Sequence, residues 1–91
     1  MQFAEERVRD VVEEYYRIGE QHWKETDLYQ RGQIFNPDIN RYIQSNEIGI
    51  YHLFTAREEG KLVGDIGCYI TPSMHTQRLI AQEDTWYLLP E

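Results

Sequence analysis

The sequence is poor in several features that mark common protein classes. It holds one cysteine, Cys68, in 91 residues, which excludes a disulfide framework and favours a reducing compartment such as the cytoplasm. No apolar run approaches the roughly 20 residues of a membrane-spanning helix. Nine Lys and Arg stand against 16 Asp and Glu, and the resulting net charge of −7 argues against binding to nucleic acid phosphates. We therefore expect neither a membrane nor a nucleic acid partner.

Motifs for metal binding and for nucleophilic catalysis are also missing. His22, His52 and His75 lie far apart in the sequence, without neighbours at metal-ligand spacing, so no zinc site is expected. No Ser-His-Asp grouping and no phosphate-binding loop is discernible. Cys68 has no obvious base beside it, and we interpret it as a small packed hydrophobic residue.

The strongest pattern that is present covers residues 50–72. Aromatic and branched residues alternate with polar ones on both sides of Gly60, which is able to adopt positive φ in a tight turn. This pattern predicts an antiparallel hairpin that ends at Pro72, because proline lacks the N–H needed to extend a strand. A further strand is predicted at 79–89, where the polar run 82–85 indicates a bulge or side chains directed at a cleft.

Two helices are predicted before the hairpin. Apolar residues at helical spacing predict the first over 2–24, with Gly19 marking a close contact between this helix and the sheet. Asn36 as N-cap, followed by Pro37 and Asp38, predicts the start of the second. Residues 25–35 read as a loop that is pinned to the core.

Together these elements predict an α+β fold in one domain, residues 1–91. Two helices are expected to pack on one face of a three-stranded antiparallel sheet whose strand order follows the chain. The predicted core consists of Val8, Val12, Tyr15, Ile39, Ile43, Leu53, Leu62, Ile66, Cys68 and Trp86.

This order of elements resembles the N-terminal half of a GNAT (Gcn5-related) N-acetyltransferase. The resemblance rests on Asn36-Pro37-Asp38 opening the second helix, on FTAREEGKLVGDIGCYITP at 54–72, and on AQEDTWYLLPE at 81–91 in the position of the fourth strand. The cadence A-R-x-x-G-K-L-V-G is common in that family, especially among acetyltransferase-like proteins of phages. The family's first strand is expected to be missing or reduced, since only residues 1–4 precede the predicted helix.

The resemblance also bears on cofactor and catalysis. The family binds acetyl-CoA through a glycine-rich loop and a following helix, and the pattern Q/R-x-x-G-x-G/A does not occur in this chain. We therefore expect these residues to bind no cofactor on their own, and acetyl-CoA only if a missing half is present. Glu83 lies on the strand where many members place a general base, with Asp84 beside it; a bulge or hydrogen-bonding role is the alternative for Glu83.

Two functions of different class follow. In the first, the chain is a complete, catalytically inactive half-domain that binds another protein, for a phage protein as an inhibitor of a host system in the host cytoplasm. In the second, it is the N-terminal part of an enzyme that transfers acetyl from acetyl-CoA to an amine. The partner in the first case, another protein or a second copy, is expected to add a strand at an exposed edge, 79–89. The carboxylates of 83, 84 and 91 favour a basic neighbour, and the expected contact residues are Asp84, Trp86, Tyr87, Leu88 and Leu89.

Overall fold

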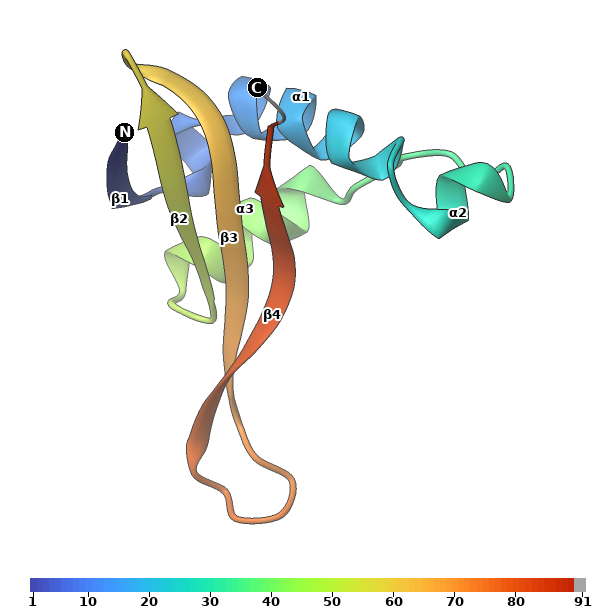
Figure 1. Ribbon diagram of the computed structural model, residues 1–91. Coiled ribbons are helices and arrows are strands. Elements are labelled where there is room, and N and C mark those ends of the chain that lie inside the picture. The colour runs from blue at the N-terminus through green and yellow to red at the C-terminus, as the bar shows by residue number, and fades with distance from the viewer. Residues whose placement is uncertain (90–91) are drawn as a thin grey trace.

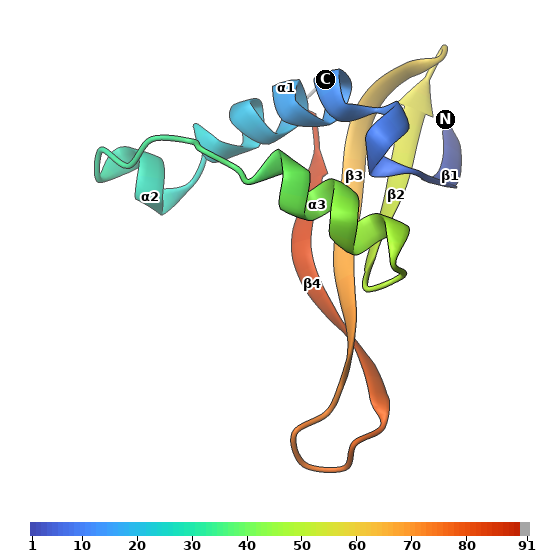
Figure 2. The same ribbon diagram turned by 180° about the vertical axis from the view of Figure 1, so that it is seen from behind.

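The chain folds into a single antiparallel sheet with its helices on one face (Figures 1 and 2). The computed structural model describes residues 1–89, and for residues 27 and 29 the backbone alone. The sheet has four strands in the order β1-β2-β3-β4. The elements are β1 Gln2–Glu6, a 3-10 turn Val8–Asp10, α1 Val12–Trp23, α2 Asp27–Gln30, α3 Ile39–Glu47, β2 Tyr51–Glu58, β3 Lys61–Pro72 and β4 Leu79–Leu88. Within residues 1–89, no helix is long and apolar enough to cross a membrane.

The α+β prediction is confirmed, but the predicted number of strands and the predicted start of the first helix are wrong. Residues 2–6 form β1, which pairs with β2 from Gln2 opposite Arg57 to Glu6 opposite Leu53. Arg7 is extended, and α1 begins only at Val12. Gln, Ala and Glu are good helix formers, but helix propensity is easily overridden by tertiary context, and pairing with β2 overrides it here.

The connection to α3 differs in two details from the prediction. The short helix α2 interrupts the predicted loop 25–35 and lies away from the sheet (Figure 1). The cap of α3 is Asp38 rather than Asn36: its side chain accepts a hydrogen bond from the Arg41 N–H at 3.1 Å. A carboxylate at this position satisfies one of the free N–H groups of the first turn.

The hairpin between β2 and β3 turns as predicted. Glu59 has φ 51° and Gly60 has φ 79°, between the closing pair Glu58 and Lys61. Two successive residues with positive φ match the right-handed twist of the flanking strands. The predicted positive φ of Gly60 is confirmed.

A bulge in β3 makes part of the predicted core wrong. Ala56 pairs with Gly64 while Arg57 pairs with Leu62, so Val63 is an extra residue. One extra residue reverses which side chains face the helices. Leu62 is therefore buried, whereas Ile66 and Trp86 lie on the opposite face and are 41% and 67% exposed. Cys68 shares that opposite face and is half-buried.

The core lies between the sheet and the two longer helices. One buried cluster comprises Val8, Val11, Tyr15, Tyr51 and Leu53, with Ile43 packed against it; the other comprises Ile18, Leu62 and Tyr87. Of the predicted core residues, Val8, Tyr15, Leu53 and Leu62 are buried, and Val12, Ile39 and Ile43 are half-buried.

Candidate functional site

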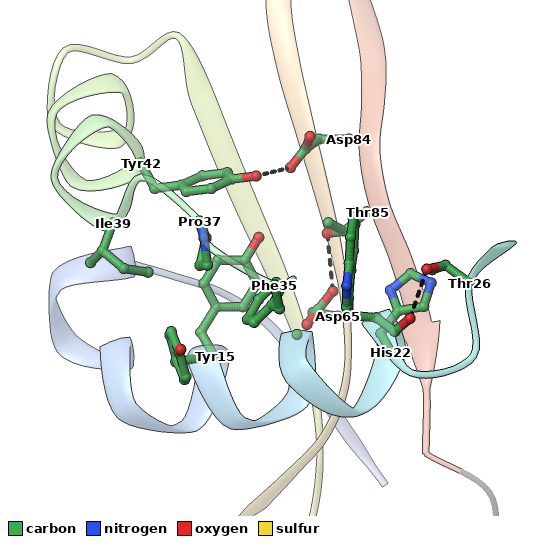
Figure 3. Close-up of a pocket in the computed structure, with 13 residues that line it drawn as sticks. Tyr15, His22, Thr26, Phe35, Pro37, Ile39, Tyr42, Asp65, Asp84 and Thr85 are labelled. Atoms are coloured by element: carbon green, nitrogen blue, oxygen red, sulfur yellow. Dashed lines mark hydrogen bonds between the residues drawn. The ribbon is translucent and has the colours of Figure 1, made fainter. Parts of the chain in front are cut away.

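A cavity of about 270 Å³ lies between α1, the segment before α3, α3 itself and the helix-facing side of β3 and β4. Figure 3 shows its lining: aromatic rings from the helical side, and Asp65, Asp84 and Thr85 from the strands. An apolar cavity with a few polar groups on one wall is the usual form of a small-molecule site.

Phe35 forms part of the outer wall of this cavity. Its ring lies against Gly19, where an added Cβ would come within 2.9 Å of the Phe35 Cζ atom. The ring also contacts Tyr16 and Trp23, with centroids 5.3 and 5.9 Å away. The Trp23 Nε1–H donates to the Gln33 carbonyl at 2.9 Å and ties the segment to α1. The prediction that Gly19 marks a helix–sheet contact is therefore wrong, because the close neighbour is this loop.

Four tyrosines form a cluster of packed rings, and two of them, Tyr15 and Tyr42, also line the cavity. The rings of Tyr15, Tyr42 and Tyr69 each pack on another ring of the cluster, with Tyr51 at its centre. The Tyr15 and Tyr51 hydroxyls are 2.5 Å apart. Burial raises the pKa of Tyr15 to about 12 and raises the pKa of Tyr51 further, so these phenols remain protonated donors.

Asp84 reaches the cavity because β4 bulges at this residue. Gly67 pairs with Thr85 and Cys68 with Glu83, so Asp84 has no partner in β3. The predicted bulge in 82–85 is confirmed. The Tyr42 hydroxyl donates to the Asp84 carboxylate at 2.8 Å, and the Tyr51 hydroxyl lies 3.4 Å from the same oxygen.

Asp65 is the buried carboxylate of the site, only 5% exposed. The Thr85 hydroxyl donates to its Oδ1 atom at 3.1 Å (Figure 3). Burial raises the pKa of Asp65 to about 6; the negative charge of Asp84 adds to the rise, and the Thr85 hydrogen bond opposes it. An ionised carboxylate in such a place requires a cationic partner to offset its desolvation.

Gly67 makes room for this arrangement. A Cβ at this position would come within 1.8 Å of the Tyr51 hydroxyl oxygen. The Gly67 N–H donates to the Thr85 Oγ1 at 3.2 Å, which directs the threonine hydroxyl proton toward Asp65.

Comparison with known proteins places this geometry in a known fold. No protein-family model matches the sequence, and no curated protein matches it. Among solved structures, a ribosomal-protein-alanine N-acetyltransferase from Brucella melitensis biovar Abortus 2308 aligns with a TM-score of 0.64 and 22% identity, over 97% of this chain and 57% of its own. An aminoglycoside acetyltransferase from an uncultured soil metagenomic sample, solved with trehalose, aligns at 0.69 and 14% identity, over 97% and 55%. A predicted acetyltransferase from Clostridium acetobutylicum, solved with acetyl-CoA, aligns at 0.65 and 12% identity, over 98% and 60%.

The chain has a partial GNAT-like fold. It spans a little over half the length of the structures that it matches, and the identities of 12–22% establish the fold alone. The resemblance that was noted in the sequence is confirmed at this level.

The sheet places Glu83, the predicted general base, and Asp84, a predicted partner-binding residue, in different surroundings. Glu83 pairs with Cys68 and is exposed, on the face that carries Trp86 and Leu88. Its neighbour Asp84 lines the cavity instead. A catalytic role for Glu83 stays a prediction.

The predicted partner residues divide between two faces in the same way. Trp86 and Leu88 are exposed, whereas Tyr87 is only 9% exposed and stacks on His22, with centroids 4.5 Å apart. Leu89 is half-buried and packs beside the second core cluster. Residue 91, whose charge entered the same prediction, lies outside the described residues.

The GNAT-like fold implies acetyl-CoA, and the described residues do not fit its pyrophosphate. In residues 1–89, no glycine-rich turn leads from a strand into a helix, so no convergent set of N–H groups is directed at a phosphate. The same residues contain no grouping of His, Cys, Asp and Glu suited to a metal ion.

Proposed function

We propose that this chain binds a primary amine in the cavity between α1, α3 and β4, as the acceptor side of an N-acetyltransferase. The observation that carries the proposal is the pair of carboxylates, Asp65 and Asp84, on one wall of a cavity whose helical side is rich in aromatic residues. An ammonium group suits both walls, because it pairs with carboxylates and is attracted to the faces of aromatic rings.

The solved neighbours support the amine as the class of ligand. One is an N-acetyltransferase of a ribosomal protein alanine, and the metagenomic aminoglycoside acetyltransferase was also solved in complex with sisomicin, at a TM-score of 0.68 and 14% identity. Transfer of an acetyl group by a protein that contains this chain is part of the proposal, and no glycine-rich turn that could hold the acetyl donor is found in residues 1–89.

The proposal is tested by mapping ligand contacts in the ¹⁵N-labelled chain by NMR. Benzylamine at pH 7.5 is expected to shift the amide signals of residues that line the cavity, such as Thr85 and Tyr42. Benzyl alcohol has the same ring without the charge and is expected to shift them far less. Equal responses to the two compounds, or shifts confined to the other face of the sheet, would contradict an amine site.

A second function, protein binding through β4, is favoured by a separate observation. β4 is one of the two edge strands of the described sheet, the other being β1, and it exposes Leu79, Trp86 and Leu88 at 73%, 67% and 55%. An outer strand with exposed apolar side chains is able to pair with another chain. Exposed Glu83 favours a basic partner over a second copy.

Amide hydrogen exchange over 79–89 tests this second function. Protection of these amides should rise with protein concentration if copies pair, and on adding a basic partner if one binds. Exchange that stays fast under both conditions would rule out strand addition.

A further inference from the structure

Resting on the proposed amine-binding function, we propose that Asp65 accepts the proton of the bound ammonium group. Thr85 positions the Asp65 carboxylate, and Asp84 is a second anionic contact for the amine. This assigns the proton acceptor to β3 and to the cavity, on the opposite side of the sheet from Glu83.

The hydrogen bonds around Asp65 leave one of its oxygens for a ligand. The Gly67 N–H donates a hydrogen bond to the Thr85 Oγ1, and the Thr85 hydroxyl in turn donates to Asp65 Oδ1. The hydrogen bonds formed by the described residues engage Oδ1 alone, while the residue lines the cavity. An amine in the cavity is therefore able to donate an N–H to Oδ2.

Several titratable groups share the cavity with Asp65, yet its environment differs from that of Asp84. The titratable groups that line the cavity with Asp65 include Asp84 on β4, Tyr42 on α3, and Tyr15 and His22 on α1.

Asp84 is exposed and accepts a hydrogen bond from Tyr42, whereas Asp65 is buried and its pKa is raised to about 6. Two carboxylates in contrasting environments are suited to different roles, and a group that titrates near neutral pH is the more effective proton acceptor.

The proton transfer is balanced without any other reactant. One N–H bond of the ammonium group breaks, and its electron pair stays on nitrogen as the lone pair of a neutral amine. The proton forms an O–H bond with Asp65 Oδ2, which turns the carboxylate into a neutral carboxylic acid. The amine is then a nucleophile, and the acid returns its proton to solvent.

The test measures the affinity of the full chain for benzylamine between pH 4.5 and 8 by isothermal titration calorimetry. Because the ammonium group pairs with ionised Asp65, affinity should be level above pH 7 and about tenfold lower at pH 5. The Asp65→Asn variant should bind more weakly, with an affinity that no longer changes over this range. The matched variant Glu83→Gln should retain the wild-type profile.

A second measurement keeps the test decisive if Asp65→Asn does not fold. The ¹³C signal of the Asp65 carboxyl should titrate near pH 6 in the free chain and at lower pH with benzylamine bound. Thr85→Val keeps the side-chain volume and removes the hydroxyl, so it should raise the pH at which Asp65 is half-titrated in the free chain. A purely structural Asp65 would not respond to the ligand.

The outcomes separate the two proposals. Binding of benzylamine with an unchanged Asp65 midpoint, or a pH profile that persists in Asp65→Asn, would overturn the role of Asp65 and leave the amine site standing. Failure of the wild-type chain to bind benzylamine at any pH would overturn the amine site and this inference with it.

Discussion

At the scale of single residues, Asp65 is the side chain whose chemistry is most at odds with its place. A carboxylate that is 5% exposed lowers the stability of the folded state when it is ionised, because desolvation disfavours the charge. Residues that lower stability in this way are often kept for function. The conflict is therefore itself an argument that Asp65 serves a ligand.

We predict that Asp65→Asn stabilises the free chain at pH 7.5, by about 1–3 kcal/mol. The folded pKa of about 6 lies above the ordinary 3.8, so the folded state binds the proton more tightly. The contribution of wild-type Asp65 to the stability of the folded state is thus fully present below pH 3.8 and is lost as pH rises through 6. The gain from the variant should therefore vanish near pH 4. Urea unfolding at both pH values measures it; an equal effect at the two would contradict the assignment.

The same residue shows what sequence alone could not supply. Alternation over 62–70 places Asp65 opposite Leu62, and without the bulge at Val63 it would face away from the helices. Glu83 and Asp84 are adjacent carboxylates, and only the bulge in β4 decides which of them enters the cavity. The polar run 82–85 predicted a bulge in β4 but not that it falls at Asp84, and no local pattern indicated the bulge at Val63, because its place depends on pairing between strands.

At the scale of elements, the hairpin was predictable and its neighbours were less so. Gly60 and Pro72 mark the two ends of β3. Both act through local backbone constraints, which can be recognised from the residue type alone. β1 was missed because its five residues are strand only through pairing with β2. The start of α3 was misplaced by two residues because Asn36 and Asp38 are both competent caps.

We predict that Gly60→Val lowers the free energy of unfolding by about 1 kcal/mol or more, since a β-branched residue is strained at a φ of 79°. Lys61→Val places the same side chain on the adjacent exposed strand position and should change stability by less than about 0.5 kcal/mol. Thermal and urea unfolding give both values. Equal stability of the two variants would show the turn to be assigned wrongly.

Arg57 joins three elements, and we predict that Arg57→Lys destabilises the fold by about 1–2 kcal/mol. The guanidinium of Arg57 on β2 donates to Glu6 on β1, to Glu14 on α1 and to the Gly60 carbonyl, at 2.8–3.2 Å. A lysine has no planar fork to serve all three. Arg9→Lys is the control, because Arg9 pairs with Glu47 at the surface and such pairs contribute little.

The pH dependence of this effect has a defined sign. Hydrogen bonds from Arg57 hold the pKa values of Glu6 and Glu14 below the ordinary 4.5. Their contribution is therefore present above pH 4.5 and is lost as pH falls through the lowered values. The difference between wild type and Arg57→Lys should shrink in acid; a difference that stays constant to pH 2 would contradict the network.

At the scale of the whole molecule, the described residues provide a cavity that suits the proposed amine but no site that suits the cofactor implied by the GNAT-like fold. The proposed amine site has a formed cavity, whereas no phosphate cradle is found in residues 1–89. The net charge of −7 also opposes an anionic cofactor. We predict negligible affinity of this chain for acetyl-CoA in isothermal titration. A micromolar dissociation constant would show that the cofactor is bound by means other than a glycine-rich loop.

The central claim is that the carboxylates of the cavity, and not those of the opposite face, recognise an amine. The most direct measurement is calorimetric titration of benzylamine at pH 7.5 into wild type, Asp84→Asn and Glu83→Gln in parallel. Asp84→Asn removes one of the two carboxylate charges in the cavity and should weaken binding about tenfold, the equivalent of about 1.4 kcal/mol. Glu83→Gln should bind like wild type. Loss of binding in Glu83→Gln with full retention in Asp84→Asn would contradict the account.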